Sequence, residues 1–236
     1  MMKQFLCRLA GAIALLASVV VAGSATVLGQ RYYSPDFSIG VKGGATLSRM
    51  DFVPHISQNM TPGMTFGIMA RYSEEKLFGL LGELNITQRG WAEDFRGLPV
   101  SYSRHLTYIQ LPLMTQIRFG WKRVKLFVNL GPEAGYMLGD KIKSDFDYSD
   151  PVASVPGYSS NRHNEQMTMD VANRFDYGIA GGLGAEFFVA RRHSMTLEGR
   201  FYYGIGNIFR ATRTSTFSAS RGLSVEITLG YFFRVI

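Results

Sequence analysis

The chain has 236 residues, 46% of them hydrophobic, and a formal charge of +7 from charged residues scattered along its length. Its mild, dispersed charge disfavours nucleic acid as a partner, and the length is typical of one domain, since β-barrels often use about 200 residues or more as a unit. The single cysteine, Cys7, lies close to the N-terminus, so disulfides and thiolate metal sites are excluded for the rest of the chain.

Residues 1–29 have the layout of a secretory signal peptide. A short region with two basic residues comes first, the apolar stretch LAGAIALLASVVVA follows, and small residues come after it. The stretch is shorter than the ~20 residues of a comfortable membrane span, which favours a cleaved signal over an uncleaved anchor helix. We expect cleavage between residues 24 and 29, and we expect residues 30–236 to form the exported domain.

From residue 36 onward, apolar and polar residues alternate with the period of two that is typical of β-strands. The stretch DFSIGVKGGATLS shows this alternation over its whole length. Most of the alternating segments have about 11 to 16 residues, roughly twice the usual strand length in soluble proteins. Eight of them follow one another, at residues 36–48, 62–72, 78–91, 105–119, 124–138, 174–190, 195–205 and 223–235.

The connections between these segments alternate in length. Short turns are expected at residues 73–77, 120–123 and 190–194, and longer loops at about residues 49–61, 92–104, 139–173 and 206–222. An even number of strands, with short turns at one end and long loops at the other, is the pattern of outer-membrane barrels. The sequence therefore predicts an all-β fold, an eight-stranded antiparallel transmembrane β-barrel in the cell outer membrane, with both termini periplasmic.

The same periodicity fits a soluble β-sandwich or a lipocalin-like barrel, whose apolar face turns inward. Two features favour the membrane. The apolar faces carry almost no charge, and aromatic residues gather near the predicted strand ends, as in the belts at membrane interfaces. The aromatic residues at the turn end are Phe37, Tyr72, Phe78, Phe119 and Trp121, and those at the loop end are Trp91, Tyr102, Tyr136, Phe175 and Tyr177.

If the apolar face meets lipid, the polar face lines a barrel interior that is just wide enough for side chains to fill. Charges of opposite sign can pair there, which reduces the cost of burying each one alone. We expect a structural ion-paired network, and the alternative is a narrow polar path for small solutes. For Glu133 the first expected partner is Arg89 and the second is Arg200. The expected network comprises Lys42, Arg71, Glu83, Arg89, Arg118, Lys125, Glu133, Asp176, Glu186, Glu198, Arg200, Glu226 and Arg234.

Small outer-membrane barrels can be lipid-modifying hydrolases, so each histidine is a candidate member of a Ser-His-acid set. His55 and His163 fall in predicted loops, and His193 falls in a predicted turn. Only His105, beside Ser103, could join an outward-facing set, and no acidic partner is evident on the neighbouring strands. The sequence also lacks a nucleophile elbow, metal-ligand spacing and a phosphate loop. We therefore expect no enzyme, and no catalytic, cofactor or metal site.

Two of the long loops carry unbalanced charge. The loop at residues 139–173 is rich in aspartate, which could hold calcium through oxygen ligands, although the spacing matches no calcium-loop motif and favours solvated charge. The loop at residues 206–222 contains Arg210, Arg213 and Arg221 and no acid. These arginines would suit the phosphates of lipopolysaccharide, and ordinary surface charge explains them equally well.

Five segments of the predicted strands carry a family resemblance: ELNITQRGW, YIQLPLMTQIRFG, NLGPEAGYMLG, DYGIAGGLGAEF and EGRFYYGIGNIF. They resemble the PorT-like outer-membrane β-barrel family of Bacteroidetes-type bacteria, and the resemblance covers roughly residues 36–236. It implies two alternative roles. One is an accessory to protein secretion by the type IX pathway, or to cell-surface assembly, acting through extracellular loops and partners. The other is a stand-alone porin-like or structural barrel. The expected partners are outer-membrane lipid, lipopolysaccharide and other secretion-pathway proteins.

Overall fold

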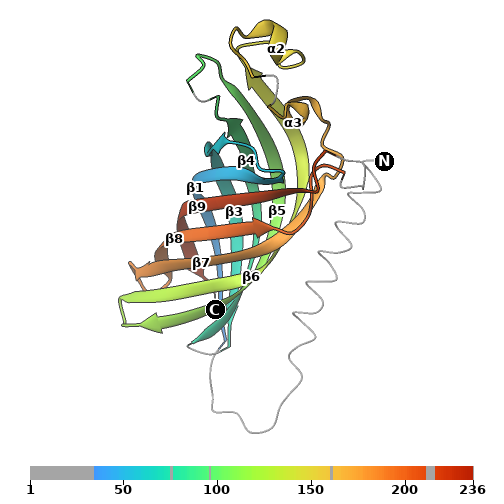
Figure 1. Cartoon of the computed structure of the whole chain (residues 1–236). Coiled ribbons are helices and arrows are strands. Elements are labelled where there is room, and N and C mark those ends of the chain that lie inside the picture. The colour runs from blue at the N-terminus through green and yellow to red at the C-terminus, as the bar shows by residue number, and fades with distance from the viewer. Residues whose placement is uncertain (1–34, 75–76, 96, 160–161, 211–215, 236) are drawn as a thin grey trace. The chain divides into compact units, whose positions relative to one another are not determined.

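The alternating segments form long strands in the computed structural model (Figure 1). The predicted signal peptide at residues 1–29 lies outside the described part of the chain, and so does Arg213. The structure describes residues 35–74, 77–95, 97–159, 162–210 and 216–235.

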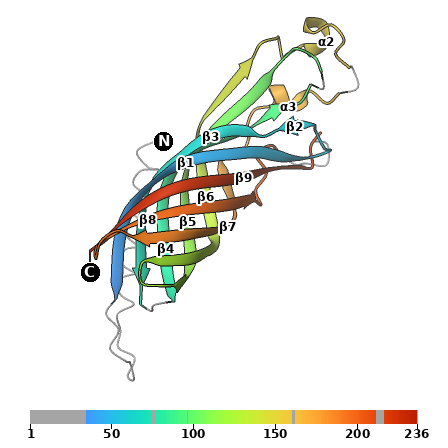
Figure 2. The ribbon, with the colours of Figure 1, turned by 90° about the vertical axis from the view of Figure 1, so that its left-hand side faces the viewer.

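Within these residues, eight long strands run up and down around a closed ring. Each long strand pairs antiparallel with the next long strand along the chain, and β9 returns to pair with β1. Figure 2 shows β1, β9 and β8 side by side. The predicted antiparallel barrel of eight strands is confirmed. The strands are β1 (Asp36–Val53), β3 (Thr61–Ser73), β4 (Phe78–Glu93), β5 (Tyr102–Gly120), β6 (Val124–Ser144), β7 (Phe175–Phe188), β8 (His193–Gly204) and β9 (Ala219–Arg234).

The two ends of the barrel differ. Short connections follow β3, β5 and β7 at one end, which we call the turn end, and Ser38 pairs with Arg234 near it. The opposite end, the loop end, carries the two-residue strand β2 (Gln58–Asn59), which pairs with β4. It also carries α2 (Pro151–Ser154) and α3 (Glu165–Thr168) in the β6–β7 connection. In the described part of the chain, no helix is both long and apolar enough to cross a membrane.

Several strands, among them β1, β5, β6 and β9, extend further at the loop end than the sequence predicts, and β6 extends the most. The alternation in the sequence ends at residue 138, whereas β6 runs on to Ser144 and pairs with β5 from Tyr102 onward. The pairing shifts by one residue at a bulge beside Thr107 and Tyr108. Charged residues and the bulge break the simple alternation there, which is why the sequence pattern predicts a loop where the structure has strand.

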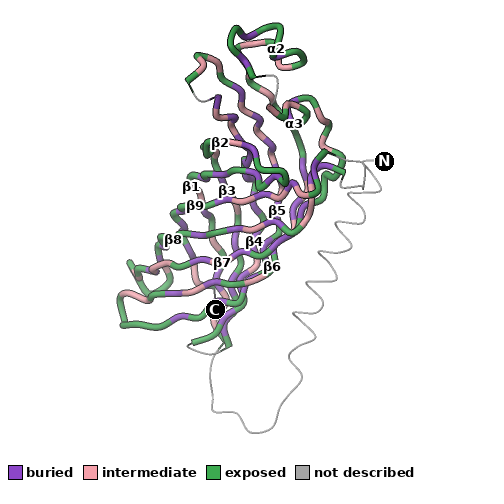
Figure 3. The backbone as a smooth tube through the Cα atoms, viewed as in Figure 1, coloured by how far each residue is buried: buried purple, intermediate pink, exposed green. Residues whose placement is uncertain are grey.

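The two faces of each strand are chemically opposite. Side chains such as Val41, Phe66 and Leu183 are exposed on the outer wall, while Lys42 and Thr65, one residue away, are buried inside. Figure 3 shows the resulting alternation of buried and exposed positions along the strands. The outer wall is therefore apolar and the interior is polar, which is the arrangement of a barrel that lies in lipid.

The predicted aromatic belt at the loop end is partly wrong. Phe175 and Tyr177 are exposed on the outer wall, but Trp91 and Tyr102 are fully buried inside the molecule. Trp91 follows Arg89 by two positions in β4, so a strand period of two places both side chains on the interior face. The five aromatic residues expected at the turn end are half-buried or exposed there.

Candidate functional site

Eleven of the thirteen charged residues of the expected network fall into three groups along the barrel axis, and the first group lies at the turn end. Arg71 and Glu186 form a bidentate ion pair, with Nη2–Oε1 and Nη1–Oε2 distances of 2.8 and 3.0 Å. The Arg118 guanidinium lies 3.9 Å from the same carboxylate, and the Ser194 hydroxyl donates to it at 2.7 Å. All of these side chains are buried. Two cations therefore share one carboxylate in this turn-end group.

The middle group has equal numbers of acids and bases. Arg200 binds Glu83 through two hydrogen bonds of 2.7 and 2.8 Å, and its Nε donates to Glu198 at 3.0 Å. The Lys42 ammonium lies 2.6 Å from Glu83, and Asn129 donates to Glu198 at 2.9 Å. Each carboxylate thus accepts charge-assisted hydrogen bonds, which are stronger than neutral ones.

The loop-side group has one base and three acids. Arg89 Nη2 lies 2.6 Å from Glu133 and 3.3 Å from Glu226, and Nη1 lies 3.9 Å from Asp176. The guanidinium also covers the Tyr202 ring at 3.8 Å, and the Tyr202 hydroxyl donates to Asp176 at 2.9 Å. The Glu133 carboxylate therefore lies against the guanidinium of Arg89.

Two members of the expected network lie apart from these groups. Lys125 is half-buried, and its amine lies 5.3 Å from the ring centroid of Phe188. Arg234 is near the turn end and pairs with Asp36 at 2.9 Å, where both side chains are partly exposed to solvent. Both residues are close to strand ends, so their long side chains reach the rim of the barrel instead of its centre.

An apolar layer covers the charged groups on the loop side. We call it the apolar plug. Phe52 makes an edge contact with Trp91 at 5.5 Å between ring centroids and stacks with Phe209 at 5.9 Å. Because its members come from β1, the β1–β2 connection, β4, β5, β6 and the β8–β9 connection, the plug spans the interior. It consists of Met50, Phe52, Ile56, Trp91, Leu106, Tyr108, Met137, Ile208, Phe209 and Phe217.

The β6–β7 connection is folded rather than extended, and we call its described residues, 145–159 and 162–174, the cap. Their apolar side chains form a small core with the inner face of the longer strands β5 and β6 and with the β4–β5 connection. Figures 1 and 2 show α2 beyond the loop end of the barrel. The buried members of this core are Phe95, Tyr102, Val155, Tyr158 and Met167.

Polar contacts tie the cap to the barrel wall. The Tyr102 hydroxyl donates to the Met167 carbonyl oxygen at 2.9 Å, and Arg104 Nη1 donates to the Met169 carbonyl oxygen at 2.7 Å. Arg162 pairs with Glu93 at 2.9 Å. These three contacts attach the part of the cap that follows residues 160–161, and the Ser101 backbone N–H attaches the earlier part by donating to Asp145 at 2.8 Å.

Two ionisable groups of the cap have shifted pKa values. The Ser101 backbone N–H donates to the Asp145 carboxylate at 2.8 Å and lowers the pKa of Asp145. Burial raises the pKa of the Tyr158 phenol. Among the described residues, no group of three or more His, Cys, Asp or Glu side chains is arranged to hold a metal ion.

The candidate hydrolase pair faces basic residues. His105 is directly opposite Lys141 in the β5–β6 pairing, and Ser103 is opposite Lys143. His193 contacts the hydroxyl of Tyr231 at 2.6 Å near the turn end. No acid stands opposite Ser103 or His105 on β6.

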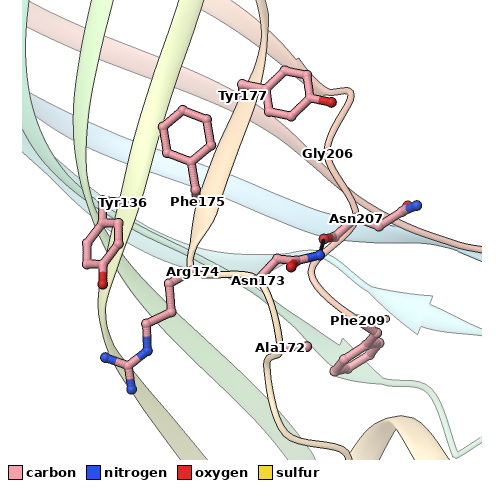
Figure 4. Close-up of a pocket in the computed structure, with 9 residues that line it drawn as sticks. All are labelled: Tyr136, Ala172, Asn173, Arg174, Phe175, Tyr177, Gly206, Asn207 and Phe209. Carbon is pink, nitrogen blue, oxygen red and sulfur yellow. Dashed lines mark hydrogen bonds between the residues drawn. The ribbon is translucent and has the colours of Figure 1, made fainter. Parts of the chain in front are cut away.

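A pocket of about 630 Å³ opens at the loop end where β6, β7 and the β8–β9 connection meet (Figure 4). No pattern in the sequence indicates it, because it depends on where neighbouring strands end. Its lining includes Tyr136, Asn173, Arg174, Phe175, Tyr177 and Asn207.

Sequence comparison identifies the family. Residues 30–210 match the family described as "Outer membrane protein beta-barrel domain". Among curated protein sequences, none matches this chain.

Several solved structures are similar to this chain. The Ail protein of Yersinia pestis, solved with sucrose octasulfate, is 15% identical, with 84% of this chain and 99% of that chain covered and a TM-score of 0.42. OprG of Pseudomonas aeruginosa is 13% identical, with 86% and 97% covered and a TM-score of 0.47. Neisserial surface protein A is 13% identical, with 85% and 98% covered and a TM-score of 0.43. On the family match, the chain belongs to the outer membrane protein β-barrel domain family and is a transmembrane barrel of the cell outer membrane.

Proposed function

We propose that this outer-membrane barrel belongs to the PorT-like branch and serves as an accessory to protein secretion by the type IX pathway, or to cell-surface assembly. The resemblance of segments such as NLGPEAGYMLG and DYGIAGGLGAEF supports the branch. In this proposal the loop end faces the cell exterior, and the turn end, where β1 begins and β9 ends, faces the periplasm, as in barrels with short periplasmic turns.

The observation that carries the proposal is the folded cap above a filled interior. Ion-paired side chains occupy the barrel, and the apolar plug spans it on the loop side. Such an interior favours a role at the surface of the protein over passage through it. Long ordered connections are usually functional, and this one has its own apolar core and several polar attachments. We therefore assign partner contact to the cap.

The role is proposed to be non-enzymatic. Catalysis by a Ser-His set needs an acid that orients the imidazole, whereas the cross-strand neighbours of Ser103 and His105 are Lys143 and Lys141. A cationic neighbour disfavours the imidazolium that such a mechanism forms.

The alternative is a stand-alone porin-like or structural barrel with at most a narrow solute path. The polar middle and turn-end groups favour it, because a polar interior could admit water and small solutes if the apolar plug moved. This reading requires the plug to open, whereas the accessory role requires it to stay closed.

Gene deletion followed by measurement of surface protease secretion tests the proposal. We expect secretion to be lost on deletion and restored by the full-length gene. A chain in which residues 146–159 are replaced by a flexible linker should enter the membrane normally and fail to restore secretion. Unchanged secretion in the deletion strain would remove the secretion role.

A further inference from the structure

The pocket on the outer wall is built by three segments that meet where the sheet divides. β6 pairs with β7 only as far as Tyr136, opposite Phe175, and then continues to Ser144 in pairing with β5. On the other side of this notch, Asn173 Nδ2 donates to the backbone carbonyl oxygen of Asn207 at 2.8 Å. Figure 4 shows Phe175 and Tyr177 on one side of the contact between Asn173 and Asn207, and Arg174 extending away from them beside Tyr136. Paired strands and this cross-connection therefore fix the shape of the pocket.

One side of the pocket is continuous with the lipid-facing wall. The rings of Phe175 and Tyr177 stack at 6.0 Å between centroids. Both are exposed, and Ile179 and Leu183 continue the exposed apolar surface along β7 towards the turn end. Aromatic residues in this position mark the level of a membrane interface. An occupant of the pocket could thus extend an apolar tail along β7 into the bilayer.

Arg174 supplies the positive charge of the pocket lining and is exposed. Lys141 and Lys143 do not line the pocket, but they are exposed farther along the outer face of β6, on the part of that strand that extends past β7. Among the described residues, none of these three cations forms an ion pair. They are therefore available to an anionic group that comes from the membrane surface.

We propose that this pocket binds the phosphorylated sugar headgroup of an outer-leaflet glycolipid, with its acyl chains against β7. Arginine and lysine bind phosphate oxygens through charge-assisted hydrogen bonds, and the exposed aromatic rings offer faces for a sugar ring. The pocket lies at the interface, where such a headgroup lies. The assignment differs from the arginine-rich loop at residues 206–222 that the sequence indicates, and it rests on the proposed orientation, with the loop end outside.

Native mass spectrometry of the purified full chain with bisphosphorylated lipid A tests the assignment. We expect one lipid A to be retained per barrel. Arg174→Gln should weaken retention by about fivefold through the loss of a charge-assisted contact, and Phe175→Ala should weaken it through the loss of an aromatic face. Arg49→Gln is the matched control, because Arg49 is an exposed arginine near the loop end of β1, on another part of the wall. It should retain lipid A as the parent protein does.

Three results would overturn the assignment: no retention by the parent chain, equal retention by the Arg174→Gln and parent chains, or equal losses in the Arg174→Gln and Arg49→Gln variants. Displacement by inorganic phosphate at similar concentration would indicate a free-phosphate site instead. Labelling of Ser149→Cys in intact cells with a membrane-impermeant maleimide checks the orientation separately. Retained lipid A with unchanged secretion in the deletion strain would contradict the secretion role and leave the lipid site standing.

Discussion

At the scale of single residues, Arg89 is the residue on which the loop-side group depends. It is the one base in this group of four charges, and three carboxylates lie within 3.9 Å of its guanidinium. Removing one partner of a buried ion pair leaves an uncompensated charge. The loss of unfolding free energy should therefore be much larger when Arg89 is replaced than when one of the more distant acids is replaced.

We predict a rank order for substitutions in this group. Arg89→Met should lower the free energy of unfolding most, by about 3–5 kcal/mol, because it leaves three carboxylates together. Glu133→Leu should cost less, since Glu226 remains at 3.3 Å. Glu226→Gln should cost least, because it also removes repulsion between acids. Urea unfolding in lipid vesicles measures all three, and a Glu133→Leu barrel as stable as the parent would show that this pair is dispensable.

A glycine makes room for the middle group. A Cβ atom at Gly182 would lie 2.5 Å from Oε1 of Glu198, which is the carboxylate that pairs with Arg200. Gly182→Val should therefore destabilise the barrel by about 1–3 kcal/mol through overpacking.

Gly199 provides the control for this substitution. It is on the adjacent strand and faces the outer wall, and a Cβ atom added there would have no neighbouring atom within 4 Å. Gly199→Val should leave the unfolding midpoint close to that of the parent. Equal changes in the unfolding midpoint for the two substitutions would mean that the interior has room for a larger side chain at Gly182.

Sequence reasoning works well for these residues because strand periodicity assigns each side chain to a face. Periodicity alone places Glu133 and Arg89 in the interior, and their charged atoms lie 2.6 Å apart. The prediction fails for Trp91 and Tyr102 because it follows their aromatic character, which suggests a membrane interface, although the strand period puts both side chains inside. Strand periodicity also cannot predict that Lys125 lies outside the network. Near a strand end a long side chain can extend either into the barrel or towards its rim, and periodicity does not distinguish the two.

At the scale of elements, the attachment of the cap to the β4–β5 connection depends on pH. The folded structure lowers the pKa of Asp145, so the contact with Ser101 stabilises the cap above the pKa of this group in the unfolded chain. This contribution is lost as the pH falls through the lower, folded pKa.

The Ser101 amide proton resonance should report this loss. We expect its titration midpoint to lie below 3.8, the ordinary value for aspartate. The Asp145→Asn variant should show no such titration. A midpoint at or above the ordinary value would contradict the hydrogen bond between Ser101 and Asp145.

The elements themselves are predicted well only where one face meets lipid. The apolar and polar alternation stops near residue 138, while β6 continues to Ser144 beside a bulge. Beyond the lipid, the outer face of a strand no longer has to be apolar. Lys141 and Lys143 occupy that face of β6, so the sequence shows no apolar and polar alternation there. The cap and the pocket depend on tertiary packing between connections, and no local pattern predicts such packing.

At the scale of the whole molecule, the chain combines a filled barrel with an ordered structure at one end. The charged groups and the apolar plug occupy the interior in successive layers. The unusual features, the cap and the outer-wall pocket, both lie at the loop end. This distribution supports the proposals that recognition occurs at that end and that the interior has a structural role.

The conductance of the purified protein in a planar bilayer distinguishes a closed interior from an open one. Heat-dependent gel mobility first verifies that the barrel is folded, and a protein-free bilayer sets the background. We predict no steady, resolvable current, because paired side chains and the apolar plug fill the interior. A steady pore in the folded, full-length protein would contradict the closed interior and favour the porin-like alternative.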